Sequence, residues 1–156
     1  MDNFEKAKRI AAGYIGARMY TCHEIEDRLI RKGIDKETAE DVVSAFAENG
    51  ILDDREYARM YVSDAIRLGC KGMYRIKKEL YQKGIASSIV DSVCAENDDD
   101  TYSALMEYVE SRNLCEGITT RKELEKLKAR LARRGYSLSE INKCISEFDI
   151  HFESEY

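Results

Sequence analysis

One short phrase, ending in a basic residue, a glycine and a bulky apolar residue, occurs three times in this 156-residue chain. It reads R-L-I-R-K-G-I at Arg28–Ile34, E-L-Y-Q-K-G-I at Glu79–Ile85 and R-L-A-R-R-G-Y at Arg130–Tyr136. The glycines stand at positions 33, 84 and 135, so both spacings (84 − 33 and 135 − 84) are 51 residues. A fixed period of this length is typical of tandem structural repeats, in which each unit packs against its neighbours.

Each phrase closes a segment whose apolar residues recur at i, i+3 and i+7, which predicts a helix with one apolar stripe. The stripes consist of Cys22, Ile25 and Leu29; Met73, Ile76 and Leu80; and Leu124, Leu127 and Leu131. Glycine adopts the left-handed conformation that ends a helix at little cost, so each of these helices should end at its glycine. The apolar residue that follows can then fold back onto the helix.

A further helix should follow each glycine, after a polar cap at Asp35, Ser87 or Ser137. Its apolar positions in the three repeats are Ala39, Val42, Val43 and Phe46; Val90, Val93 and Cys94; and Ile141, Cys144, Ile145 and Phe148. One more helical segment precedes each pair, at residues 4–19, 55–68 and 101–113, with apolar positions such as Tyr57, Met60, Tyr61 and Ala65.

The sequence therefore predicts an all-α fold of three tandem three-helix repeats, resembling helix-turn-helix units and forming an elongated, curved molecule. The predicted repeats span residues 1–52, 53–98 and 99–156. The acidic run at residues 96–100 should serve as a linker that also begins a helix, because carboxylates favour the positive end of the helix dipole.

Composition and motifs exclude several classes of protein. No apolar run approaches the roughly 18 residues that span a bilayer, and the first residues do not form a signal peptide. The five scattered cysteines indicate reduced thiols in a cytoplasmic protein. We find no phosphate-binding glycine loop, nucleophile motif or metal-ligand spacing, and the adjacent Cys22 and His23 are not expected to bind a metal. We therefore expect no enzyme activity, no cofactor and no metal.

Charge is sorted by helix, although the whole chain has a net charge of −5. The three segments that end at the repeated glycines, residues 21–32, 71–83 and 121–134, have net charges of 0, +4 and +5. The segments that follow, residues 35–49, 86–100 and 137–156, have net charges of −4, −5 and −4. Solvated helix faces would explain single charges, but the repeated separation favours a polyanion, or a partner with both signs of charge, as the ligand.

The predicted basic face lies opposite the apolar stripe in the second and third repeats. Its candidate binding residues are Lys71, Arg75, Lys77, Lys78, Lys83, Lys122, Lys126, Arg133 and Arg134. Further candidate contacts are Arg55, Arg59, Tyr74 and Tyr81. The two tyrosines can either pack against the protein or stack on an unpaired base, which is worth about 1–3 kcal/mol. Tyr57 and Tyr61 are expected in the core.

The middle of the chain resembles the signature of the RecX family, regulators of the recombinase RecA. The resemblance is strongest at G-I-L-D-D-R-E-Y-A-R-M-Y-V (Gly50–Val62) and K-G-M-Y-R-I-K-K-E-L-Y-Q-K-G-I (Lys71–Ile85). Residues 20–34 and 122–136 resemble the first and last units of that family, and the resemblance extends over residues 7–148. Family members commonly have a proline where this chain has Met73.

The resemblance implies a monomeric regulator, without enzyme activity, that binds along the RecA filament on DNA and modulates, most often inhibits, its ATPase and strand exchange. It would act in recombination, DNA repair and the SOS response. The partner would be RecA with single- or double-stranded DNA in the filament, while the acidic chain would bind free DNA weakly. Two alternatives stay open: a sequence-independent DNA-binding module that acts without RecA, and a protein-interaction repeat that uses no nucleic acid.

Overall fold

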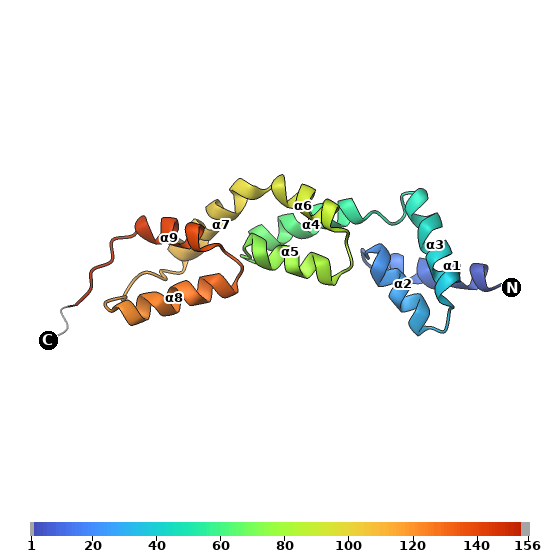
Figure 1. Ribbon diagram of the computed structural model, residues 1–156, viewed down its shortest axis with the longest axis horizontal. Helices are drawn as coiled ribbons and strands as arrows, with labels where there is room; N and C mark the ends of the chain where they lie inside the picture. Colours follow the sequence, from blue (N-terminus) through green and yellow to red (C-terminus); the bar gives the residue numbers. More distant parts are fainter. Residues whose placement is uncertain (1, 154–156) are drawn as a thin grey trace. The chain divides into compact units, whose positions relative to one another are not determined.

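The protein is all-helical, as the sequence predicts. A computed structural model describes residues 2–153, and over this range the chain forms nine α-helices and no strand (Figure 1). The helices are α1 (Asn3–Ile15), α2 (Cys22–Arg31), α3 (Lys36–Glu48), α4 (Asp54–Arg67), α5 (Met73–Gln82), α6 (Ser87–Ala95), α7 (Asp98–Ser111), α8 (Arg121–Arg133) and α9 (Leu138–Ser146). They follow one another as three sets of three, which confirms the helical repeat fold.

The three repeated phrases form the same turn. Gly33, Gly84 and Gly135 have φ values of 92°, 81° and 102°, a left-handed conformation that favours glycine. In each turn the residue after the glycine donates its N–H to the carbonyl five residues earlier: Ile34 to Leu29 (3.0 Å), Ile85 to Leu80 (3.3 Å) and Tyr136 to Leu131 (3.4 Å). The two apolar residues joined by each bond are buried, as in a Schellman motif. The repeated phrase is therefore a helix-ending signal.

Two of the three predicted caps are confirmed. The Asp35 side chain accepts from the N–H of Thr38, and the Ser137 hydroxyl accepts from the N–H of Glu140 in a capping box. The prediction for Ser87 is wrong, because α6 begins at Ser87 itself and the carbonyl of Ala86 accepts the N–H of Val90.

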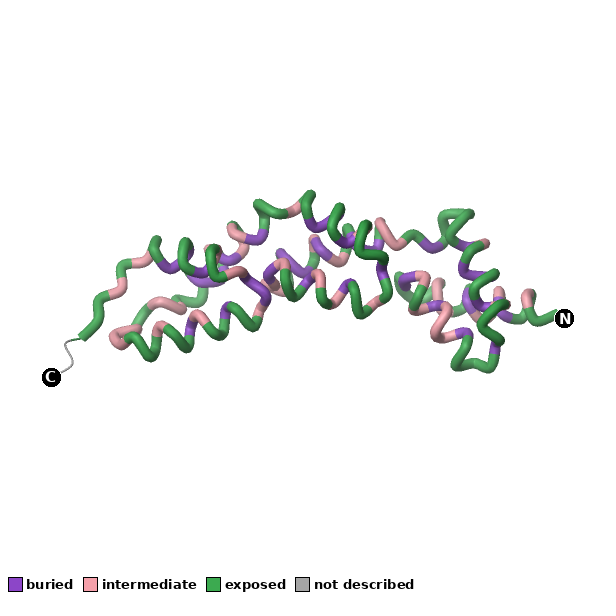
Figure 2. The backbone as a smooth tube through the Cα atoms, viewed as in Figure 1, coloured by how far each residue is buried: buried purple, intermediate pink, exposed green. Residues whose placement is uncertain are grey.

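The predicted apolar stripes form the cores. Buried positions recur along each helix and are separated by exposed ones (Figure 2). Most of the predicted stripe residues are buried, and Cys22, Met73, Leu124 and Phe148 are half-buried. Met60 was expected on the apolar side of its helix but is 47% exposed.

Contacts divide the chain into two compact units rather than three. One unit comprises the described residues up to Met60 together with Leu80–Val93, and the other comprises Tyr61–Glu79 together with the described residues from Cys94 onward. The division runs through α4 and α5 of the second repeat. The predicted repeat boundaries at residues 52 and 98 remain a prediction.

The acidic residues are not sorted by helix as predicted. Helix α3 has one basic and four acidic residues, net −3, but α6 has a single acidic residue, Asp91, and α9 has one Glu and one Lys, net 0. The aspartates at 98–100 belong to the first turn of α7, which confirms that the acidic run begins a helix. Several acidic residues counted with the last segment follow α9, and Glu155 lies outside the described residues.

Candidate charged interface on α5 and α8

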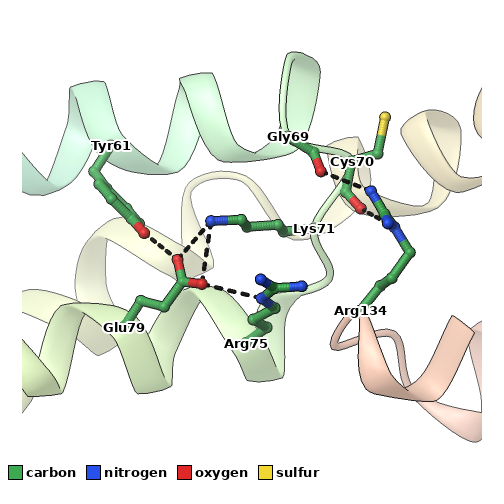
Figure 3. A network of polar contacts seen from close by, with 7 residues as sticks. All are labelled: Tyr61, Gly69, Cys70, Lys71, Arg75, Glu79 and Arg134. Carbon is green, nitrogen blue, oxygen red and sulfur yellow. Dashed lines mark hydrogen bonds and ion pairs between the residues drawn. The ribbon is translucent and has the colours of Figure 1, made fainter. Parts of the chain in front are cut away.

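The carboxylate of Glu79, on α5, accepts hydrogen bonds from three side chains. Two of these side chains are cations that were predicted to belong to the basic face. Lys71 Nζ lies 2.8 Å from Glu79 Oε2, and Arg75 Nε lies 3.0 Å from Oε1 (Figure 3). The hydroxyl of Tyr61, on α4, donates to the same carboxylate. The cluster joins α4, the loop after it and α5, so the cations of Lys71 and Arg75 are paired with a carboxylate of their own chain.

The Glu79 carboxylate is held in its charged form. Burial alone would raise its pKa, but the hydrogen bonds from Lys71, Tyr61 and Arg75 and the positive charge of Lys71 outweigh burial, so that its pKa is lowered below the ordinary value of 4.5. A carboxylate that stays ionised keeps the two cations bound over the neutral pH range.

Arg134, at the end of α8, also acts within the chain. Its Nε donates to the carbonyl of Cys70 and its Nη2 to the carbonyl of Gly69, both at 3.0 Å (Figure 3). The planar fork of a guanidinium suits two neighbouring acceptors. Cys70 has a left-handed φ of 48°, so the clasp holds a strained backbone in place. Arg134 is therefore a residue of the fold rather than of a free basic surface.

Four of the nine predicted basic residues remain free. Lys78, Lys122, Lys126 and Arg133 are exposed, and none forms an ion pair with another residue in the 2–153 range. Lys77 and Lys83 are half-buried and have contacts within the chain, such as that of the Lys83 ammonium 5.8 Å from the centroid of the Tyr57 ring. The basic surface is thus carried mainly by α8, with Lys78 on α5.

The predicted aromatic contacts separate into exposed and buried rings. Tyr74 is 70% exposed and Tyr81 is 45% exposed, with its hydroxyl 3.2 Å from Asp91 Oδ1. Tyr57 is buried, as predicted, and Tyr61 is half-buried at the Glu79 cluster. Tyr74 therefore offers the most accessible ring on α5.

The two arginines of α4 that were proposed as further contacts have partners on their own unit. Arg55 donates to the hydroxyl of Ser92 at 3.1 Å, and Arg59 lies 4.0 Å from Glu56.

Sequence reasoning missed the residues that attach one repeat to the next. The N–H of Gly72 donates to the Arg134 carbonyl at 2.8 Å, and the Thr21 hydroxyl donates to the Lys83 carbonyl at 2.8 Å. Their spacing, 72 − 21 = 51 residues, equals the repeat period, which is the signal that could have identified them.

The described residues show no group of three His, Cys, Asp or Glu side chains that could hold a metal. Burial, with a smaller effect of the nearby Asp54, raises the pKa of the Cys22 thiol to about 12, so it stays protonated and is a poor metal ligand. Of the helices in residues 2–153, none combines the length and apolar character needed to span a membrane.

A tandem three-helix repeat defines a class of all-α repeat proteins. Comparison with known families narrows this class. Residues 7–44 match the family model "RecX, first three-helix domain" and residues 53–93 match "RecX, second three-helix domain". The chain belongs to the RecX family.

Relatives named "Regulatory protein RecX" extend the match over most of the chain. One from Lactococcus lactis subsp. cremoris (strain SK11) is 27% identical over 99% of this chain and 59% of its own length. Another, from Prosthecochloris aestuarii, is 29% identical over 91% of this chain and 93% of its own length. The chain thus spans a little over half of the Lactococcus relative and nearly all of the Prosthecochloris one.

The fold is also found in a solved structure. The crystal structure of RecX from Lactobacillus salivarius matches with a TM-score of 0.79 and 24% sequence identity, covering 94% of this chain and 96% of that one. This likeness supports the helical repeat fold.

Proposed function

We propose that this protein is a cytoplasmic regulator that binds the RecA filament on DNA and restrains its ATP hydrolysis and strand exchange in recombination, DNA repair and the SOS response. The observation that carries the proposal is the set of free cations Lys78, Lys122, Lys126 and Arg133 on a protein with a net charge of −5. Membership of a family whose relatives are named regulatory proteins supports it.

Exposed cations on two helices suit a polyanionic partner, because each cation that neutralises a phosphate releases a counterion. The negative charge of the rest of the chain opposes binding to bare DNA, so a nucleoprotein filament, with protein surface beside the phosphates, is the better partner. The regulator would stabilise one geometry of the filament. It can do so only by binding that geometry more tightly than the one required for ATP turnover.

The test is a charge reversal on α8. Lys122→Glu with Lys126→Glu should raise the concentration needed to inhibit RecA ATPase on single-stranded DNA by about tenfold or more, a loss of about 1.4 kcal/mol of binding free energy. The change should not unfold α8, since Lys122 lies in its first turn, where a carboxylate favours the helix dipole. Arg75 is left intact, because a carboxylate there would face Glu79.

Lys6→Glu with Arg9→Glu is the matched control. Both residues are exposed on α1 and three positions apart, and the double variant changes the net charge by the same amount. It should inhibit like the wild type. Equal inhibition by the α8 variant and the wild type would show that α8 does not contact the filament.

A DNA-binding module that acts without RecA is the second candidate. The observation that favours it is Tyr74, 70% exposed and one helical turn before the free cation of Lys78, a spacing that suits base stacking beside a phosphate contact. Titration of the protein with single-stranded DNA alone separates the two. Binding as tight as that to the filament would favour this candidate.

A further inference from the structure

Two of the three repeated turns are each covered by the start of a helix. In the first unit, the Thr21 hydroxyl at the start of α2 donates to the Lys83 carbonyl at 2.8 Å. The first turn of α2 closes over the glycine: a Cβ added to Gly84 would lie 2.3 Å from Cβ of His23. We call this contact between a glycine turn and a helix start a joint.

The second unit contains the other joint. The Gly72 N–H at the start of α5 donates to the Arg134 carbonyl at 2.8 Å, and the Tyr74 N–H donates to the Gly135 carbonyl at 3.1 Å. A Cβ added to Gly135 would lie 2.5 Å from Cβ of Arg75. The partners of the two joints are related by the repeat period, 72 − 21 = 51 and 134 − 83 = 51 residues.

The third turn, at Gly33, has the same left-handed backbone conformation, but no helix start in the described part of the chain packs against it. Lys32 occupies the position of Lys83 and Arg134, and its carbonyl accepts no hydrogen bond from the residues that the structure describes. A Cβ added to Gly33 would meet nothing within 4 Å, in contrast to Gly84 and Gly135. The chain therefore presents one open copy of a turn that it fills twice elsewhere.

The two internal joints define the chemistry that fits the open turn. Each occupant is a helix start whose small first residue brings a hydrogen-bond donor to the carbonyl, the hydroxyl of Thr21 or the backbone N–H of Gly72. A side chain in the first turn then covers the glycine, that of His23 over Gly84 and that of Arg75 over Gly135. A nucleic-acid phosphate does not fit the open turn, because its oxygens accept hydrogen bonds and the Lys32 carbonyl is also an acceptor. The occupant is therefore a protein helix.

A second copy of this chain is a poor occupant. The start of α8, in the third repeat, already has contacts within the chain: the Glu153 N–H donates to the Thr119 carbonyl at 2.8 Å, and the Arg121 guanidinium lies 5.4 Å from the centroid of the Phe152 ring. Arg121 and Lys122 would also face Arg31 and Lys32 at the open turn, and like charges in contact oppose association.

We propose that the Gly33 turn is a docking site for the N-terminus of a helix on the protein component of the filament. The helix would have a small first residue that donates to the Lys32 carbonyl, a side chain in its first turn that covers Gly33, and an acidic residue that complements Lys32. This inference rests on the proposed function, and it places a protein contact on the first repeat, separate from the cations of α8.

The experiment compares Gly33→Asn with Gly50→Asn. Asparagine tolerates the left-handed backbone, so both variants should keep melting temperatures close to the wild type. Gly50 is also left-handed (φ 73°) and open, but it is not part of a repeated phrase. With filaments of RecA on single-stranded DNA, Gly33→Asn should bind about tenfold more weakly or worse, and Gly50→Asn should bind like the wild type.

Hydroxyl-radical footprinting of the wild type gives a second readout that needs no variant. Ile30, beside the open turn, is 40% exposed, and Ile51, beside Gly50, is 51% exposed. Filament binding should protect Ile30 from oxidation and leave Ile51 unchanged. Unaltered binding by Gly33→Asn, or an unprotected Ile30, would overturn the docking site while the proposed function stands. A wild type that does not bind the filament would overturn both.

Discussion

Among single residues, Glu79 joins α4 to α5 through its carboxylate. Its side chain is 20% exposed and accepts from Lys71, Arg75 and Tyr61. Removing the carboxylate charge would leave two neighbouring cations without a counter-charge, and hydrogen bonds to a charged group are worth about 1.5–3 kcal/mol. We expect Glu79→Gln to lower the free energy of unfolding by about that amount at pH 7, measured by urea denaturation followed by circular dichroism.

The same variant predicts a pH dependence. The pKa of Glu79 is lowered in the folded protein, so the carboxylate contributes stability above its unfolded pKa, near 4.5, and this contribution is lost as the pH falls through the lower folded value. The difference in stability between wild type and Glu79→Gln should therefore be constant near neutrality and shrink in acid. Glu125→Gln is the control, because its carboxylate is 71% exposed with one partner at 3.7 Å and should contribute less than about 1 kcal/mol. A difference that grew in acid would contradict the assignment.

Residue-level charge was the part of the site that sequence reasoning predicted least well. The helical wheel placed Arg75 and Lys78 on the same outward face, and both are exposed. It could not show that Arg75 is paired and Lys78 is not, because the cluster at Glu79 also needs Lys71, which precedes α5, and Tyr61, which lies 18 residues away. Such contacts depend on how α4 packs on α5, and the period of a single helix does not contain that information.

At the scale of elements, the second joint depends on the absence of a side chain. A Cβ on Gly72 would lie 2.2 Å from the carbonyl carbon of Gly135 and 2.3 Å from the nitrogen of Tyr136. Both are backbone atoms, which cannot move aside without displacing the turn between α8 and α9. We expect Gly72→Ala to destabilise the protein by about 1–3 kcal/mol and to open the second joint, measured as faster amide exchange at position 72 and at Tyr74, whose N–H groups donate across it.

Gly13→Ala is the matched control for this substitution. Gly13 lies inside α1, and a Cβ there would meet nothing within 4 Å. Alanine in a helix interior is favoured over glycine, so this variant should stabilise the protein by about 0.5–1 kcal/mol. If Gly72→Ala were as stable as the wild type, the start of α5 would not lie this close to the Gly135 turn in solution.

The elements themselves were largely predictable, because the signals are local. Apolar period, helix-ending glycines and caps lie within a few residues of the structure they specify, and all nine predicted helices occur among residues 2–153. The segments used for the charge count, residues 86–100 and 137–156, extend past the ends of α6 at Ala95 and α9 at Ser146. No glycine or proline separates α6 from the aspartates that begin α7, so the acidic run could belong to either helix by sequence. The helix dipole predicts that the acidic run lies at the start of a helix. Only the structure shows that this start is at Asp98.

For the whole molecule, the net charge limits how much contacts with DNA phosphates can contribute to the binding affinity. The chain has a net charge of −5, and its proposed basic surface has four free cations. With single-stranded DNA, each phosphate contact contributes about −0.7 to the slope of log affinity against log salt concentration. Four contacts give a slope of about −3. We expect filament binding to show a slope no steeper than this, because the docking of a helix at Gly33 would add affinity with little salt dependence.

The double variant Lys122→Glu with Lys126→Glu should reduce the magnitude of this slope by about 1.4, that of two phosphate contacts. Lys6→Glu with Arg9→Glu should leave the slope unchanged. Gly33→Asn should weaken binding at every salt concentration and also leave the slope unchanged, since it removes a protein contact and no charge. Fluorescence anisotropy of the labelled protein, titrated with filaments at several salt concentrations, measures all three. A common loss of slope in all three variants would mean that the cations of α8 and the Gly33 turn do not act on different parts of the filament.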